Sequence, residues 1–158
     1  MLNILLVILL LICAYTDFKH RKIYNMVLLP ALLLGFALNL WENGLIGYKE
    51  SLLGMLLGAA LLLIPYFMGG MGAGDVKLLA AIGAIGGIGF VFQVFVFTAL
   101  VGGLMALIAA LKSGTLMLTL IRAANPRVTG NLNEQVGSAT IPYGLAIAAG
   151  GLMALLLG

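Results

Sequence analysis

A chain of 158 residues in which 63% of the side chains are hydrophobic and only 8% are charged does not have the composition of a water-soluble globular domain. Its formal net charge is +3, but the eight lysines and arginines are spread over short polar segments and form no basic stripe. These features predict a membrane protein and argue against a nucleic-acid partner.

Apolar runs follow one another along the chain, separated by polar segments. Five of them approach the length that spans a bilayer, because an α-helix rises about 1.5 Å per residue. A sixth, shorter run extends from Val76 to about Gly87 and ends in glycines that should separate it from the next helix. We therefore predict a single all-α membrane domain over residues 1–158, a polytopic bundle of about six transmembrane helices. The five longer runs cover about residues 1–16, 26–41, 51–68, 90–111 and 139–157.

The lysines and arginines predict the orientation of the chain, because these residues are retained on the cytoplasmic side in short loops. Alternate polar segments contain seven of the eight: three in residues 17–25, one in 69–77 and three in 112–138. Only Lys49 falls in an intervening segment. The count predicts that the N-terminus lies outside and that the three basic segments lie at the cytoplasmic face.

Two of the five acidic residues stand at ends of predicted helices on this cytoplasmic face. Asp17 follows the first apolar run, and Asp75 lies in the glycine-rich stretch "GGMGAGDVK" that leads into the short run. Glu42 and Glu50 fall on the opposite side, and Glu134 lies in the last polar segment. Two carboxyl groups, one on a turn whose glycines let another backbone approach closely, are what a two-carboxyl hydrolase needs.

Each aspartate also has a purely structural interpretation. Asp75 could be the N-cap of the helix that follows it, a common role for aspartate that is worth about 1 kcal/mol. Asp17 could be a solvated loop charge beside Lys19 and Arg21. Because both carboxyl groups are expected on one membrane face, catalysis explains the pair better than two independent structural roles.

Other kinds of site lack the residues that they need. The chain has one cysteine, Cys13, and one histidine, His20, whereas a zinc site takes three or four Cys, His or carboxylate ligands. The sequence around Ser138 is no nucleophile elbow, and the glycines of residues 69–77 match no phosphate or dinucleotide loop. We therefore predict no metal, no cofactor and no serine or thiol nucleophile.

Three segments of the chain resemble the type IV prepilin peptidases, membrane aspartyl proteases that are related to the archaeal preflagellin peptidases. The sequence "GAGD" at residues 72–75 is similar to the family's GxGD signature. The sequence "DFKHRKIYN" at residues 17–25 is similar to its other aspartate segment, which typically ends in Ile-Pro-Asn, and "IPYG" at residues 141–144 resembles a third element. Tyr24 stands where the family usually has proline, and Leu145 stands where proline often follows the late glycine.

The resemblance implies a membrane aspartyl endopeptidase with Asp17 and Asp75 as its catalytic pair. One aspartate, ionised, would activate water against a peptide carbonyl, while the other, protonated, would donate to the carbonyl oxygen and then to the leaving amine. The implied substrate is a prepilin or pseudopilin whose basic leader stays cytoplasmic and whose apolar segment lies in the bilayer, with cleavage after a glycine at the boundary. The residues expected to support the site are Gly72, Gly74, Lys77 and Asn25.

The longer bacterial members carry an N-terminal cytoplasmic region with paired cysteines and methylate the new N-terminus, whereas the first apolar run here leads directly to Asp17. We therefore expect the short, peptidase-only form of tight-adherence (Flp) pilus systems, without a methyltransferase region, in the inner (cytoplasmic) membrane. Three alternatives stay open. They are a preflagellin or other GxGD intramembrane protease, a small transporter in which Asp17 and Asp75 bind cations or relay protons, and a noncatalytic scaffold of a secretion system.

Overall fold

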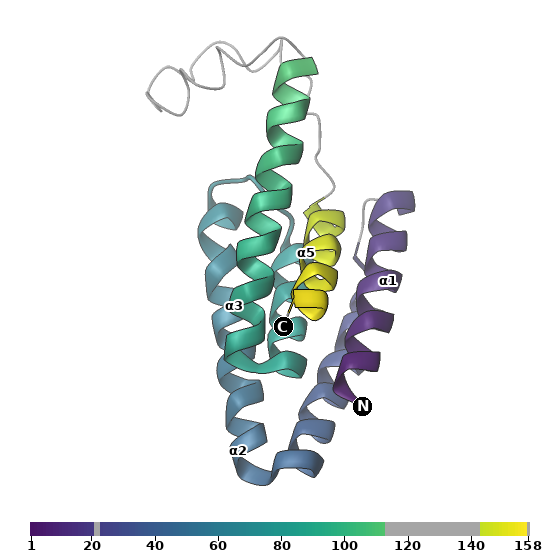
Figure 1. The fold of residues 1–158 in the computed structure, drawn as a ribbon, viewed down its shortest axis with the longest axis vertical. Coiled ribbons are helices and arrows are strands. Elements are labelled where there is room, and N and C mark those ends of the chain that lie inside the picture. The colour runs from purple at the N-terminus through teal and green to yellow at the C-terminus, as the bar shows by residue number, and fades with distance from the viewer. Residues whose placement is uncertain (21–22, 113–142, 158) are drawn as a thin grey trace.

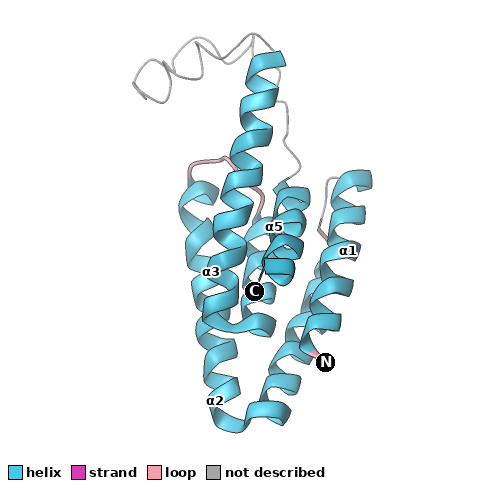
Figure 2. Cartoon of the chain, in the orientation of Figure 1, coloured by secondary structure: helices cyan, strands magenta, loops and turns pink. Residues whose placement is uncertain are grey.

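A computed structural model describes residues 1–20, 23–112 and 143–157 of the chain. All regular structure in these residues is α-helical, without a strand, which confirms the all-α prediction (Figure 2). Helices are expected in a bilayer because lipid offers no hydrogen-bond partner to an unpaired backbone. The elements are α1 (Leu2–His20), α2 (Asn25–Phe67), α3 (Ala73–Lys112) and α5 (Tyr143–Leu157).

The two longest elements, α2 and α3, each consist of two helical arms joined at one glycine. Gly44 in α2 has φ 61° and Gly87 in α3 has φ 77°, both in the left-handed region that glycine enters without steric cost. The chain reverses direction at these positions, so that the arms of α2 form a helical hairpin (Figure 1). The break at Gly87 agrees with the predicted end of the short apolar run.

The predicted number of about six transmembrane helices is not confirmed by the number of elements. The described residues form four helical elements, and three of them are long and apolar enough to cross a membrane. The polar segment between the second and third predicted runs also differs from the prediction of a loop, because residues 42–50 are helical apart from the backbone of Gly44. One glycine provides the turn that the hydropathy pattern assigns to several polar residues.

Glycines also set the spacing between the second arm of α2 and the first arm of α3. A Cβ added at Gly54 would overlap the backbone of Gly83, and a Cβ added at Gly58 would overlap the backbone of Leu79. Small residues of this kind allow the close backbone contact through which helices associate in lipid. The larger buried side chains of the core come from all four elements: Leu6, Leu9, Leu10, Leu62, Leu78, Leu79, Ile82, Ile85 and Ile147.

Asn39, in the first arm of α2, compensates for the break at Gly87. Its buried Nδ2 donates to the carbonyl oxygens of Ala84 at 3.2 Å and Ile85 at 3.0 Å. These carbonyl groups stand at the end of a helical arm, where carbonyl oxygens lack the usual partner four residues later in the helix. The contact ties α2 to α3 at the point where α3 turns.

Several helix ends meet at one end of the bundle. The end of α1, the start of α2, the loop between α2 and α3, and the start of α5 lie there, whereas the N-terminus and the turn of α2 lie toward the other end (Figure 1). Hydrogen bonds agree with this view, since one joins Asp17 to Leu145 and another joins Lys77 to Asn25. The described residues of the two segments 17–25 and 69–77, predicted on one membrane face, therefore share one end of the molecule. Most of the third predicted segment, 112–138, lies outside the described residues.

Candidate active site

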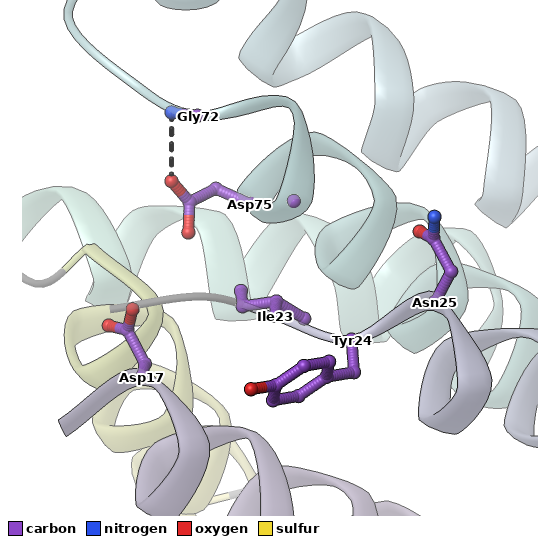
Figure 3. A pocket seen from close by; sticks show the side chains of 7 residues that line it. Asp17, Ile23, Tyr24, Asn25, Gly72 and Asp75 are labelled. Carbon is purple, nitrogen blue, oxygen red and sulfur yellow. Dashed lines mark hydrogen bonds between the residues drawn. The ribbon is translucent and has the colours of Figure 1, made fainter. Parts of the chain in front are cut away.

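Asp75 belongs to the turn that starts α3. Its Oδ2 accepts a hydrogen bond from the N–H of Gly72 at 3.1 Å, and its own N–H donates to the Gly72 carbonyl oxygen at 3.1 Å (Figure 3). The first bond is one half of a capping box, in which the side chain of the third helical residue bonds back to the N–H of the residue before the first turn; the second is a backbone turn, because Gly72 has no side chain to accept it. Asp75 is therefore not the N-cap itself, as the structural interpretation supposed, although its side chain does help to close the turn.

Asp17 lies in the last turn of α1 and is held by a different helix. Its Oδ2 accepts a hydrogen bond from the backbone N–H of Leu145 at 3.1 Å, across the interface between α1 and α5. Leu145 is in the first turn of α5, where N–H groups have no partner within the helix and the helix dipole favours negative charge. Because Asp17 is only 6% exposed, it is not the solvated loop charge of the structural interpretation.

The two carboxyl groups line one pocket of about 380 Å³. Figure 3 shows Asp17 and Asp75 on two sides of it, with Ile23 and Tyr24 on the chain segment between α1 and α2. Both aspartates are buried, and each uses its Oδ2 for a backbone hydrogen bond. Among the described residues, no donor is hydrogen-bonded to either Oδ1. Within the described part of the chain, each carboxyl group is thus anchored through one oxygen and keeps the other free of hydrogen bonds.

The two glycines of the "GAGD" sequence line this pocket but differ in their surroundings. A Cβ added at Gly74 would lie 3.2 Å from the Cβ of Ile23, which is tighter than ordinary contact. A Cβ added at Gly72 would lie 3.5 Å from Oδ2 of Asp75, which is an ordinary contact distance. Gly74 is therefore the position at which the start of α3 needs a residue without a side chain to approach the segment before α2.

Asn25 and Lys77, the other two predicted supporting residues, are hydrogen-bonded to each other beside the pocket. Nζ of Lys77 donates to Oδ1 of Asn25 at 3.2 Å. Asn25 lines the aspartate pocket, whereas Lys77 does not and instead lines a neighbouring cavity together with Asn25. Within the described residues, Lys77 is therefore linked to the aspartate pocket only indirectly, by its hydrogen bond to Asn25.

The start of α5 is a part of the site that the predicted site residues do not include. A Cβ added at Gly144 would lie 2.7 Å from Oδ2 of Asp17, so the carboxyl group packs directly on the glycine. Leu145 supplies the N–H bound to Asp17, and a proline at that position would have none to donate. The "IPYG" segment was a signal for this region, but sequence similarity gives no sign of the backbone contact itself.

Among the described residues, no cysteine, histidine or glutamate lines the pocket with the two aspartates. Among the residues that the structure describes, no three Cys, His, Asp or Glu side chains form a group that could hold a metal ion. Cys13 is buried one turn before Asp17 and does not line the pocket. Glu134 and Ser138 lie outside the described residues. The expectation that activity needs neither metal nor thiol stays a prediction.

Comparison with known proteins places the sequence of this chain in a family. The model of the type IV leader peptidase family matches residues 4–107, which include both aspartates and end before α5. The chain belongs to this family. It is also 32% identical over 156 residues to the prepilin leader peptidase/N-methyltransferase of Bacillus subtilis (strain 168), an alignment that covers 95% of this chain and 53% of that protein.

The chain thus spans about half the length of this curated relative of the type IV leader peptidase family. No solved structure matches the chain. Membership of the family confirms the resemblance drawn from the three sequence segments. The long apolar helices agree with a membrane protein.

Proposed function

We propose that this chain is a membrane aspartic endopeptidase that removes the basic leader peptide from type IV prepilins at the cytoplasmic membrane boundary. One observation carries the proposal: two buried carboxyl groups from different helices, Asp17 and Asp75, line the same pocket. Each is anchored through one oxygen by a backbone N–H, which leaves the other oxygen for catalysis. Family membership supports peptide-bond hydrolysis and a prepilin substrate.

The proposed reaction is general acid–base hydrolysis. The ionised carboxylate of the pair takes a proton from water as the water oxygen forms a bond to the peptide carbonyl carbon. The protonated carboxyl group of the other aspartate gives its proton to the carbonyl oxygen. The tetrahedral intermediate then collapses: the second aspartate, now ionised, takes a proton from a hydroxyl group of the intermediate and passes it to the leaving nitrogen as the C–N bond breaks. The first aspartate keeps the proton from water, so the pair again shares one proton. The products are the leader with a new carboxyl end and the pilin with a new amine.

Backbone anchoring suits this reaction because it fixes the carboxyl groups without using the oxygens that must exchange protons. Preorganised groups avoid reorientation at the moment of reaction, which is a large part of how enzymes lower barriers. Asp75 is fixed by its own turn through Gly72, and Asp17 is fixed by the start of α5. The two anchors come from segments more than sixty residues apart in sequence, so the site depends on the assembled bundle.

The proposed membrane arrangement uses the helical arms on either side of Gly44 and Gly87 as separate spans. Together with α1 and α5, they would give six spans. The basic-residue count then puts the N-terminus outside and the aspartate pocket at the cytoplasmic side of the inner membrane. This arrangement would bring the pocket to the height of a substrate whose basic leader is cytoplasmic and whose following segment is apolar.

The deciding experiment is cleavage by the purified protein in detergent and in proteoliposomes. The substrates would be a panel of prepilins that includes tight-adherence (Flp) pilins, which the sequence resemblance favours, and a preflagellin. Mass spectrometry should find a new N-terminus directly after a glycine. A protein that cleaves none of them but passes protons or cations across the proteoliposome membrane would replace this proposal with the transporter alternative.

A further inference from the structure

A second cavity lies beside the aspartate pocket, between α2 and α3. Its volume is about 330 Å³, at the lower end of the range for ligand sites. Asn25 lines both spaces, so the two adjoin at the start of α2. The cavity is lined by Asn25, Leu28, Leu29, Leu32, Lys77 and Ala80.

The second cavity lies deeper along the helices than the carboxyl groups do. Both α2 and the first arm of α3 begin at the end of the bundle that holds the aspartates and run away from it (Figure 1). Leu28 and Leu32 are three and seven residues beyond Asn25, and Ala80 is five residues beyond Asp75. At about 1.5 Å per residue, these side chains lie roughly 5–10 Å further into the apolar part of the bundle.

The lining of the second cavity changes from polar to apolar in the same direction. Lys77 and Asn25, joined by their 3.2 Å hydrogen bond, stand where it meets the aspartate pocket. Further along the helices the walls are leucine and alanine side chains. Leu28 and Ala80 are buried, and Leu29 is 60% exposed.

We propose that this cavity binds the first apolar residues after the scissile bond of the substrate, an inference that rests on the proposed function. A prepilin is polar before the cleaved bond and apolar after it, and the two spaces repeat that order from the pocket inward. The depth of roughly 5–10 Å corresponds to two or three residues of extended chain at about 3.3 Å each. A lipid acyl chain could also pack against the leucine side chains, but its binding would not explain why the cavity adjoins the aspartate pocket, whereas binding of the substrate does.

The test compares two tryptophan substitutions on α2. Leu29→Trp adds volume at a lining position where the exposed side chain leaves room for the protein to fold. Leu34→Trp is the matched control, because Leu34 is also exposed on α2, at 50%, and does not line the cavity. The substrate would be a synthetic membrane-inserted peptide with a basic leader, a glycine before the cleaved bond and an apolar segment of about 20 residues.

Leu29→Trp should raise KM about ten-fold or more, with a smaller change in kcat, because the added ring would occupy space that the apolar part of the substrate needs. Leu34→Trp should leave both constants near the values of the unmodified protein. Equal effects of the two variants, or none, would overturn the inference. If the unmodified protein did not cleave the peptide at all, the proposed function itself would be overturned, so the two failures are distinguishable.

Photocrosslinking gives a second readout that does not depend on turnover. A photoreactive residue placed two positions after the glycine of the peptide should crosslink to residues 28–32, and one placed in the basic leader should not. Leu29→Trp should weaken the first crosslink. Crosslinking of the apolar position only outside α2 and α3 would show that the substrate does not enter the cavity, and the inference would be wrong.

Discussion

Gly144 at the start of α5 lies directly against the carboxyl group of Asp17. A Cβ on this glycine would lie 2.7 Å from Oδ2 and 2.8 Å from Cγ of the aspartate. These atoms belong to a buried group, so the added methyl group cannot be accommodated without displacing the carboxyl group or α5. The start of α5 therefore fixes where one of the two proposed catalytic groups can be.

Gly144→Ala should lower kcat for prepilin cleavage by about a hundredfold, because displacement of a catalytic group by about 1 Å costs rate on that scale. KM should change much less. Gly102→Ala is the control, since its new Cβ would meet α5 only at an ordinary distance of 3.8 Å from Tyr143. Thermal unfolding in detergent would establish that both variants are folded. A Gly144→Ala protein with near-normal kcat would show that the bundle yields at this contact.

Leu145→Pro tests the hydrogen bond from Leu145 to Asp17 separately from the packing of Gly144 against the same carboxyl group. Proline fits the first turn of a helix, where its missing N–H breaks no helical hydrogen bond, so only the bond to Asp17 is lost. The dipole of α5 remains. We expect cleavage to fall by less than about ten-fold, the loss of roughly one hydrogen bond. A decrease as large as that of Gly144→Ala, with the protein folded, would show that this one donor is indispensable.

The helical content could be predicted from the sequence because hydrophobic composition leaves few choices in a bilayer. The turns were harder. The break at Gly87 lay at the end of a visible glycine cluster, whereas Gly44 stands alone between residues that keep helical backbone. The polar residues around it suggested a loop. Whether a polar segment is a loop or two helix ends joined by one residue depends on backbone angles that hydropathy does not encode.

Part of the candidate site could likewise be predicted from the sequence, and part could not. Asp17, Asp75, Gly72, Gly74 and Asn25 could be found from motifs, and they line one pocket. The contribution of α5 depends on a backbone N–H and on the absence of a side chain, neither of which has a strong sequence signature. The neighbouring cavity was only partly visible in the sequence: Asn25 and Lys77 were predicted to support the site, but the rest of its lining is leucines and an alanine like many others in this chain.

Gly74→Val tests whether the start of α3 must approach the segment before α2. The Cβ alone would lie 3.2 Å from the Cβ of Ile23, and the two further methyl groups of valine would require the turn that holds Asp75 to move. Cleavage should fall by at least about a hundredfold. Gly72→Ala should be milder, since its Cβ would meet Asp75 at an ordinary 3.5 Å. Equal activity of the two variants would show that the close approach of Gly74 has no catalytic importance.

Asp17→Asn and Asp75→Asn are the central test of the proposed chemistry. Asparagine keeps the size of the side chain and an oxygen that can accept the N–H of Leu145 or of Gly72, so both anchors can persist. It cannot exchange protons as a carboxyl group does. Each variant should therefore lose at least about a thousandfold in kcat, and the double variant should be little worse than either single one, because groups that act as a unit are not additive.

Glu50→Gln provides the matched control for the loss of a carboxyl group elsewhere. Glu50 is an exposed residue of α2 and does not line the aspartate pocket, so this variant should cleave at nearly the unmodified rate. Membrane insertion and thermal unfolding would be measured for every variant. If Asp75→Asn proved as active as the unmodified protein, its side chain would serve only to close the turn with Gly72. The same result for Asp17→Asn would leave the proposed reaction without its second carboxyl group.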